Sequence, residues 1–476
     1  MSLNFKFHKF KFVHIIYSVM LAALVALPSS PGSGLDSNRC LFYLSIVFSS
    51  VIIHLVKHRS DNWLRPDVVF LLGFLIVHYQ WLLMILVSGV FPELRAFVIS
   101  MEAHATYGAW ISTIALISWL AGYAITYHPK DIEIDRLKNK SVMLYLTIAF
   151  FVGFVVSVES GYFTAELYRT VQVDFTQTVT GISAYFLTIN GIFSLILLSI
   201  FFYPRIVERL KMAEKDLSLT QGQGFKRGEI LVLISYFSLY IIAFLMAGER
   251  GQIIQIISAI SMIYAVNYRP IRFFEFALLA GLAAVSFTII GIARALEGSF
   301  SADLIFGNFG FWAVTQNLAQ SSITLYQGID LIHTENRLFF GQLWLSQVMG
   351  LVPFLQSGFL ALTGWGLETI SSASLITDYI TGPNLHTGFG TSFVIDTYMN
   401  FGIPGIIVFS FLYGYVCKIV SAWLTGTSGF PRFFVSVAFV SLLFYVSRSS
   451  LLIQLQPVVW GLLFIMLFVP IRRRRP

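Results

Sequence analysis

The stretch LMAGERGQII, residues 245–254, places two full charges, Glu249 and Arg250, between two apolar runs. A run of about 18 to 20 apolar residues is long enough to cross roughly 30 Å of hydrocarbon as a helix. Charges at the centre of a bilayer are costly, whereas charges near helix ends reach the headgroups. The stretch therefore predicts a short turn between two membrane helices.

The composition extends this interpretation to the whole chain. The chain has 476 residues, of which 57% are apolar and 12% are charged, whereas a soluble domain carries about 25% charged residues. Irregular backbone cannot face lipid, and the apolar residues do not alternate with the period of a strand. We therefore predict an all-α polytopic integral membrane protein.

The apolar segments predict about 12 membrane helices. Their expected ranges are 12–28, 40–56, 67–90, 105–127, 141–158, 181–203, 229–247, 252–267, 273–293, 397–417, 432–446 and 451–471. The first segment also has the basic, apolar and small-residue order of a signal peptide, but its apolar run is long, which favours a retained anchor.

Three regions follow from these helices. Residues 1–293 hold helices one to nine, residues 294–396 form a large external loop, and residues 397–476 hold the last three helices and the C-terminus. The loop is rich in aromatic and apolar residues, which predicts short amphipathic or re-entrant helices at the membrane surface. It is not an ordinary hydrophilic domain.

The distribution of basic residues orients the chain. With the N-terminus in the cytoplasm, 24 of the 31 Lys and Arg residues fall on the cytoplasmic side, as the positive-inside rule requires. Both termini are then cytoplasmic. The seven external cations are all arginines: Arg39, Arg95, Arg169, Arg250, Arg294, Arg337 and Arg448.

Four of these arginines lie at the external ends of separate elements and suggest an anion site. Arg250 begins a helix, where the unpaired amide groups and the helix dipole favour a negative ligand. Arg448, Arg294 and Arg169 lie at three other external positions. Arginine presents a planar fork that suits phosphate or carboxylate. Interfacial snorkelling is the alternative explanation for each arginine taken alone.

Three side chains are candidates for a general base. Glu249 either neutralises Arg250 or accepts a proton from a substrate hydroxyl. His386 lies in a glycine-rich external loop with Asp396 close by in the sequence, although a lone loop histidine is usually only that. The sequence has no Walker motif, no nucleotide-binding glycine pattern and no zinc-ligand spacing. We therefore expect no cofactor, no metal and no nucleic-acid partner.

Four motifs together resemble a known family. They are AGERGQII (247–254), RLFFGQLWLSQVMGLVPFL (337–355), GFGTSFVIDTYMNFGIPGIIVFSFLYGYV (388–416) and FYVSRSSL (444–451). Their order and their predicted side of the membrane are similar to those of the Wzy-type O-antigen and enterobacterial common antigen polymerases. The sequence VPFLQSG departs from the proline-arginine or proline-rich turn of much of that family, so we assign no catalytic role there.

The resemblance implies a glycosyltransferase on the periplasmic face of the bacterial inner membrane. Its donor would be a growing glycan on undecaprenyl diphosphate, and its acceptor one oligosaccharide repeat unit on the same lipid carrier. Undecaprenyl diphosphate would leave, with an inverting or a retaining outcome. The bilayer is the necessary surrounding, and a polysaccharide chain-length regulator is a further partner that the resemblance leaves open.

Diphosphate departure builds negative charge, which fixed arginines stabilise. We expect Arg250 and Arg448 to form the diphosphate clamp, and Glu249, His386 and Asp396 to be the base candidates in that order. The expected substrate-binding residues are Arg169, Arg294, Arg337, Tyr168, Tyr398 and Asn400.

Two other functions remain open at this stage. An O-antigen ligase, which transfers the glycan to lipid A core, would share the lipid donor, the large loop and the arginines. A transporter of polysaccharide or lipid carrier would carry paired charges deep inside its helices. Apart from histidines, the predicted helix interiors are nearly free of ionisable groups, which favours an enzyme.

Overall fold

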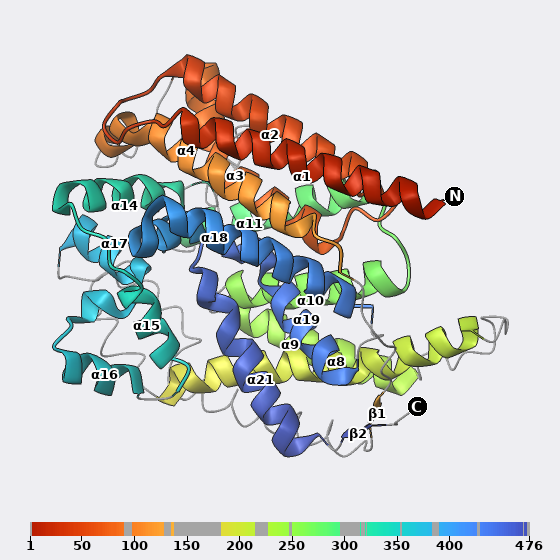
Figure 1. Ribbon diagram of the computed structural model, residues 1–476. Helices are drawn as coiled ribbons and strands as arrows, with labels where there is room; N and C mark the ends of the chain where they lie inside the picture. Colours follow the sequence, from red (N-terminus) through yellow and green to blue (C-terminus); the bar gives the residue numbers. More distant parts are fainter. Residues whose placement is uncertain are drawn as a thin grey trace.

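The computed structural model is a mainly helical bundle (Figure 1). It describes residues 2–89, 98–127, 135–137, 182–214, 227–246, 250–295, 315, 319, 321–352, 355–382, 390–425, 429–469 and 471–473. The described residues confirm the predicted all-α class, apart from two three-residue strands, β1 (Asp135–Leu137) and β2 (Ile471–Arg473), which pair antiparallel.

The long helices are those that the apolar segments predict. In the first part of the chain they are α1 (Ser2–Ala26), α2 (Ser37–Lys57), α3 (Pro66–Ser88), α4 (Val98–Tyr123), α8 (Ile182–Glu214), α9 (Arg227–Met246), α10 (Arg250–Asn267) and α11 (Phe273–Ala295). Near the C-terminus they are α18 (Phe393–Trp423), α19 (Phe430–Ser441) and α21 (Leu455–Phe468). The four-residue helix α20 (Leu443–Val446) follows α19, and the 3₁₀ helix η3 (Leu451–Gln454) precedes α21. The predicted segment 141–158 lies outside the described residues.

Within the described part of the chain, five helical stretches are long and apolar enough to cross a membrane, and shorter apolar helices accompany them. The five are Ser37–Lys57, Pro66–Ser88, Ile189–Leu210, Phe393–Trp423 and Leu451–Phe468. Because α18 begins at Phe393, the expected boundary between residues 396 and 397 falls inside this helix. Asp396 is therefore in the first turn of α18 rather than in a loop.

Short helices occupy the region between α11 and α18. They are α14 (Ser322–Glu335), α15 (Gln342–Met349), α16 (Leu355–Thr363), η2 (Leu367–Ile370) and α17 (Ser372–Thr381). They gather at the left end of the bundle in Figure 1, whereas the start of α1 and the β1–β2 pair lie toward the right. The prediction of short helices within residues 294–396 agrees with this part of the structure.

Helices α4 and α18 cross with their backbones almost touching. A Cβ added at Gly122 would lie 1.9 Å from the carbonyl oxygen of Phe411, and one added at Gly414 would lie 2.0 Å from that of Trp119. Small residues allow such close approach between membrane helices, where packing rather than the hydrophobic effect drives association. This crossing fixes α18, which carries Asp396, against the N-terminal helices.

A break near the start of α18 shapes the end of the bundle. Gly402 has φ 63° and ψ −156°, and Pro404 follows it. The break interrupts helical bonding there, and the carbonyl of Met399 accepts a hydrogen bond of 2.9 Å from the backbone N–H of Phe339. The segment before α15 is thereby tied to the break in α18.

Polar contacts between connecting segments fall into two sets. At the end where the short helices lie, Gly34 N–H donates to Ala103 O (2.9 Å), and His104 Nε2 lies 3.1 Å from Asp330 Oδ1. At the other end, Trp63 N–H donates to Ile271 O (2.8 Å), Asn267 Nδ2 donates to Leu424 O (3.0 Å), and Trp423 Nε1 donates to Tyr127 Oη (3.0 Å). Each set joins loops that the predicted topology places on one side.

Candidate functional site

The carboxylate of Asp396 is the hub of the most connected polar cluster at the end of the bundle where the short helices lie. The side chain is fully buried in the first turn of α18, which Ser392 caps. Oδ1 accepts a 2.6 Å hydrogen bond from the Ser372 hydroxyl at the start of α17. Oδ2 accepts from Trp344 Nε1 on α15 at 2.8 Å and from the Ser450 hydroxyl at 2.9 Å. One carboxylate thus joins α15, α17, α18 and the turn before η3.

The turn after α20 carries Arg448 and is held by this carboxylate. Ser450, two residues after Arg448, caps η3 by accepting from Leu452 N–H at 3.1 Å. The N–H of Leu451 approaches Asp396 Oδ2 at 3.4 Å. The Arg448 guanidinium lies over the Tyr445 ring, 5.7 Å from its centroid, and the residue is half-buried. Among the described residues, no carboxylate forms an ion pair with Arg448.

The same tyrosine lies beside the start of α10. The helix begins at Arg250, as the sequence predicts to within two residues. A Cβ added at the next residue, Gly251, would lie 3.5 Å from the Tyr445 hydroxyl. The first turn of α10 and the turn that carries Arg448 therefore flank Tyr445. The side chain of Arg250 is outside the described part of the structure.

The segment before α15 passes next to this cluster. Asn336 and Phe340 have positive φ values of 49° and 46°, which mark a tight, irregular turn. Arg337 is exposed, with its guanidinium 5.3 Å from the centroid of the Phe339 ring. The turn leads into α15, whose Trp344 packs edge-on against Phe401 at 5.1 Å. An exposed arginine is thus held beside the break in α18.

Two of the expected substrate-binding side chains are enclosed. Tyr398 is buried, and its hydroxyl lies 2.9 Å from that of Tyr107. Asn400 is fully buried and donates from Nδ2 to the Asp396 carbonyl at 2.8 Å. Its Oδ1 has no hydrogen-bond partner among the described residues. In this conformation the Tyr398 ring is not open for a sugar to stack on it, and the Asn400 amide is not open to solvent. Their contacts with the substrate stay a prediction.

The remaining expected site residues are not placed. Glu249, Arg169, Tyr168 and His386 lie outside the described residues, and for Arg294 only the backbone, near the end of α11, is described. Gly390, four positions after His386, has φ 77°, and a Cβ added there would lie 3.8 Å from the Arg448 carbonyl oxygen. The segment that begins at Gly390 therefore lies next to the Arg448 turn.

Sequence reasoning missed Tyr445, Ser372 and Ser450 as parts of this cluster. The signal was partly present, because Tyr445 and Ser450 both lie inside the motif FYVSRSSL. For Ser372, which lies 24 residues before Asp396, the sequence gives no indication of contact. The partners of a buried carboxylate are fixed by packing between elements.

A second polar cluster, also missed, joins the start of α4 to α14 and α17. His104 Nδ1 accepts from the N–H of Gly32 at 3.0 Å, so Nε2 carries the proton and donates to Asp330 Oδ1 at 3.1 Å. The Tyr379 hydroxyl donates to Asp330 Oδ2 at 2.9 Å. Burial, together with this hydrogen bond to Asp330, raises the pKa of Tyr379. Both nitrogens of the His104 imidazole are hydrogen-bonded. The cluster therefore has a structural role, in which it holds the start of α4 against α14 and α17.

Within the described part of the chain, no group of three or more His, Cys, Asp or Glu side chains is arranged to hold a metal ion. The two cysteines, Cys40 and Cys417, are buried and free. The positive charge at the described site comes from arginine.

Comparison with known proteins gives one match over nearly the whole chain. A family model described as O-antigen polysaccharide polymerase Wzy covers residues 10–475. No curated protein and no solved structure matches the chain. The four motifs that carry the resemblance all fall within the matched range.

Proposed function

Because this chain belongs to the Wzy family of O-antigen polysaccharide polymerases, we propose that it joins undecaprenyl-diphosphate-linked oligosaccharide repeat units into a polysaccharide. The reaction takes place at the periplasmic face of the bacterial inner membrane. The family and the apolar helices make the chain a multi-pass bacterial membrane protein that polymerises O-antigen. The lipid carrier, the membrane and its face are parts of the proposal.

The proposed topology has twelve membrane helices with both termini in the cytoplasm. Its support is the separation of the loop contacts into two sets. The contacts of His104 with Asp330 and of Asp396 with Ser450 join segments expected outside. The contacts of Trp63 with Ile271 and of β1 with β2 join segments expected inside. None of these contacts joins a loop expected outside to one expected inside.

The observation that carries the catalytic proposal is the meeting of Arg448 and the start of α10 at Tyr445. Arg448 lies over the tyrosine ring, and Gly251, which follows Arg250, lies beside its hydroxyl. The N-terminus of α10 also offers unpaired amide groups and the positive end of the helix dipole. The two arginines and this helix end form the proposed diphosphate clamp, which Arg169, Arg294 and Arg337 assist.

In the proposed reaction, a hydroxyl of the acceptor repeat unit attacks the anomeric carbon of the donor glycan. A new glycosidic carbon–oxygen bond forms, and the bond from that carbon to the diphosphate oxygen breaks. The diphosphate leaves with the electron pair, and a general base takes the hydroxyl proton. Arginines fixed at the leaving oxygen stabilise the developing charge more than the ground state, which lowers the barrier. Because the arginines supply this positive charge, the proposed reaction needs no metal.

The contacts of Asp396 argue against this residue as the general base. Its two oxygens receive three side-chain donors and approach one backbone N–H, and the side chain is fully buried. A carboxylate held in this way positions the Arg448 turn and is poorly placed to meet a substrate hydroxyl. We therefore keep Glu249 and His386 as the proposed base candidates and assign Asp396 a positioning role.

The test of this function is a chain-length ladder. The full-length protein, reconstituted in liposomes, is given lipid-linked repeat units, and the products are separated by size. A ladder of multiples of one repeat unit is the expected result. Transfer of a single preformed glycan block to lipid A core without a ladder would indicate a ligase, and movement of unchanged lipid-linked units between leaflets would indicate a transporter. Either result would overturn the proposal.

A further inference from the structure

Two of the short helices, α15 and α16, expose an apolar face at the left end of the bundle in Figure 1. The large side chains of this face are between 40% and 89% exposed: Leu345, Val348, Val352, Leu355 and Leu362. No charged residue lies in the sequence between Arg337 and Glu368. Contiguous exposed apolar patches mark contact with a partner or with a membrane. The surroundings of the two helices decide between these two occupants.

A hydrogen bond places the end of α15 beside the membrane-spanning part of α21. Trp460 Nε1 donates to Leu351 O at 2.5 Å, and Trp460 is close to the middle of the apolar stretch Leu451–Phe468. At 1.5 Å per residue, Trp460 lies roughly 13 Å along the helix from Leu451. Helical side chains lean toward the N-terminus, which brings the indole nitrogen back by about one turn, or ~5 Å. Leu351 is therefore level with residues inside the apolar stretch.

The backbone carbonyls at the end of α15 have hydrogen-bond donors within the protein. Helix ends leave carbonyl groups without intrahelical partners, and water can satisfy them only outside the membrane. Gln356 Nε2 donates to Ser346 O at 3.0 Å and to Ile370 O at 3.3 Å, while Trp460 donates to Leu351 O. Backbone N–H groups satisfy three more carbonyl oxygens, those of Val348, Met349 and Val352. This pairing is what hydrocarbon surroundings require of the segment.

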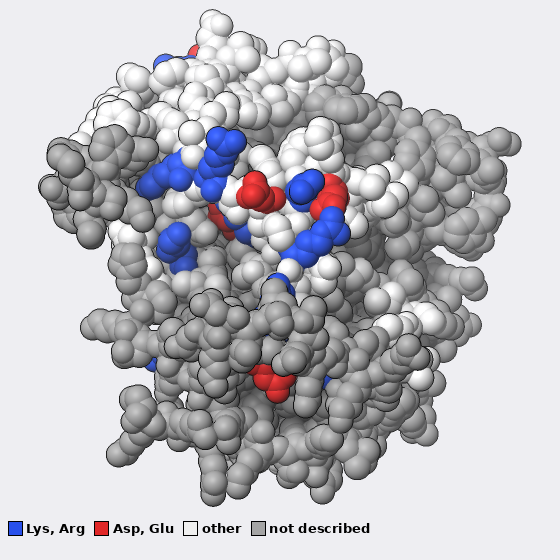
Figure 2. Space-filling model, turned by 90° about the vertical axis from the view of Figure 1, so that its right-hand side faces the viewer, with Lys and Arg blue, Asp and Glu red and all other residues white. Residues whose placement is uncertain are grey.

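The opposite end of the bundle carries exposed positive charge. Figure 2 shows that end, where Lys and Arg side chains gather with a few acids. The exposed Arg59, Arg269 and Arg272 belong to it, next to the contact of Trp63 with Ile271. Under the positive-inside rule this end faces the cytoplasm. Helices α15 and α16 would then enter the membrane from the external side.

We propose that α15 and α16 form a re-entrant element whose apolar face lies in the hydrocarbon of the external leaflet. Three observations select lipid acyl chains as the occupant: the level of Leu351 beside Trp460, the absence of charge between Arg337 and Glu368, and the internal pairing of the carbonyl groups. A protein partner in water would account for the exposed leucines but not for their level beside an apolar stretch. The inference rests on the proposed topology.

The proposed insertion connects the leaflet to the candidate site. Trp344 lies on α15 next to the exposed Leu345, and its indole donates to Asp396 Oδ2 at 2.8 Å. The same eight-residue helix therefore contacts both the leaflet and the Asp396 carboxylate. A lipid-linked repeat unit would approach the Arg448 turn from within the leaflet.

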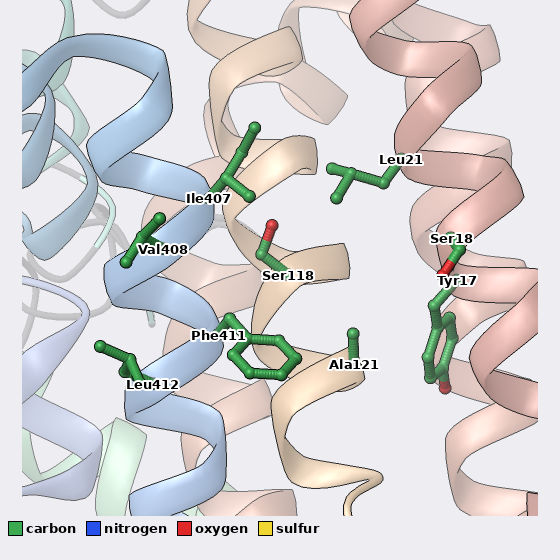
Figure 3. Close-up of a pocket in the computed structure, with 9 residues that line it drawn as sticks. All are labelled: Tyr17, Ser18, Leu21, Ser118, Ala121, Ile407, Val408, Phe411 and Leu412. Carbon is green, nitrogen blue, oxygen red and sulfur yellow. The ribbon is translucent and has the colours of Figure 1, made fainter.

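Helix α18 supplies a standard for contact with lipid. Figure 3 shows a mainly apolar cavity of about 330 Å³ between α1, α4 and α18, with Val408 and Leu412 among the residues that line it. Both side chains belong to the apolar stretch Phe393–Trp423 and are about half exposed. Leu412 is thus a position that faces hydrocarbon if α18 spans the membrane.

The test measures contact with lipid and with water at single positions of the full-length protein in liposomes. Val348→Cys and Val352→Cys are each labelled with a fluorescent maleimide. Leu412→Cys is the lipid standard, and Glu335→Cys, exposed at the end of α14, is the water standard. One quencher is a phospholipid with a nitroxide on its acyl chain, and the other is iodide in the buffer.

Two controls accompany the labelled variants. The native Cys40 and Cys417 are buried, so the unsubstituted protein reports background labelling. Monodispersity and thermal unfolding report whether each variant is folded. Because every substitution is at an exposed or half-exposed side chain, the fold should be retained.

We expect the lipid nitroxide to quench the labels at positions 348 and 352 as strongly as the label at Leu412. Iodide, which hydrocarbon excludes, should quench only the label at Glu335. Iodide quenching at positions 348 and 352 equal to that at Glu335 would place the face in water. Labels shielded from both quenchers would place a protein surface over it. Either result would overturn the proposal. The measurement needs no turnover, so its failure is distinct from a failure of the chain-length ladder.

Discussion

The hydroxyl of Ser450 donates a 2.9 Å hydrogen bond to Oδ2 of Asp396, although 54 residues separate the two in the sequence. This bond ties the turn that carries Arg448 to the first turn of α18. The same carboxylate receives Trp344 from α15 and Ser372 from α17. The position of the arginine is thus set by one buried acid, through elements that the sequence places far apart.

Arg448→Ala should abolish long-chain product while the protein remains folded. Removing one fixed donor to a developing charge costs about 100-fold or more in turnover. Arg448→Lys should also fail, because lysine cannot form a bidentate contact with the diphosphate. The chain-length ladder from lipid-linked repeat units measures both variants. The control is Arg39→Ala, an exposed arginine paired with Asp36. A wild-type ladder from Arg448→Ala would reject the clamp.

Tyr445 should act as a positioning residue between the two arginines. Tyr445→Ala removes the ring under Arg448 and the hydroxyl beside Gly251, so we expect turnover to fall by about tenfold, the equivalent of roughly 1.4 kcal/mol. Tyr445→Phe keeps the ring and should retain most of the activity. Separate kcat and KM values, measured with a lipid-linked donor, distinguish a displaced clamp from lost binding. Tyr264→Ala, which changes an exposed tyrosine near the other end of α10, serves as the control. Equal losses in the Ala and Phe variants would show that the hydroxyl, and not the ring, is required.

Asp396→Asn tests whether this acid positions the site or acts as the base. The amide would face donors from Trp344, Ser450 and Ser372 with fewer acceptor sites, and an unsatisfied buried donor costs about 1–3 kcal/mol. We therefore expect a lower unfolding temperature together with lower activity. Ser450→Ala should also lower both the unfolding temperature and the activity, but by less than Asp396→Asn.

The control for this pair is Asp61→Asn, which changes an exposed acid at the other end of the bundle. A base would behave differently from a positioning residue. If Asp396→Asn loses all activity with no change in unfolding temperature, Asp396 takes part in proton transfer and the positioning role is wrong.

The sequence predicted the helices well because the bilayer sets their length. Each expected segment within the described residues coincides with a helix or with two consecutive ones, as at α19 and α20. Apolar runs need only local information. The start of α18 was placed four residues too late because Asp396, a charged residue, was counted with the loop. A buried carboxylate is stable inside a helix only when it has hydrogen-bond partners. The partners of Asp396 come from other elements, so the sequence alone could not place this residue in the helix.

The positions of two expected site residues could be predicted from helix ends, whereas their role as a clamp stays a prediction. Arg250 begins α10, and Arg448 lies in the turn after α20, over the Tyr445 ring. The partners of Asp396 could not be predicted, since Ser372, Trp344 and Ser450 come from three separate elements. Tyr398 was expected to meet sugar, but its pairing with Tyr107 depends on a contact across 291 residues. Long-range packing decides which side chains remain open.

Gly414→Ala should destabilise the helix bundle. A Cβ at this position would lie 2.0 Å from the Trp119 carbonyl oxygen, so α4 and α18 would have to move apart. Overpacking of this kind costs about 1–3 kcal/mol or more. Thermal unfolding in detergent measures the change. Gly281→Ala in α11, where nothing lies within 4 Å of an added Cβ, is the matched control. Equal unfolding temperatures for the two variants would contradict the close crossing.

Gly402→Ala should weaken the junction between α18 and the segment before α15. At φ 63° and ψ −156°, Gly402 occupies a backbone region open essentially only to glycine, and forcing another residue there costs about 1–3 kcal/mol. The added Cβ would also lie 3.3 Å from Leu338 Cδ1. If the backbone at residue 402 became helical, the Met399 carbonyl would accept a hydrogen bond within α18. Its hydrogen bond from Phe339 N–H would then be lost. Trp344 would then lose its fixed position at Asp396, so the ladder should shorten along with the fall in unfolding temperature.

The control is Gly358→Ala in α16, where nothing lies within 4 Å of an added Cβ. This variant should change neither the ladder nor the unfolding temperature. A Gly402→Ala protein with normal stability and a normal ladder would mean that the break in α18 does not hold the site.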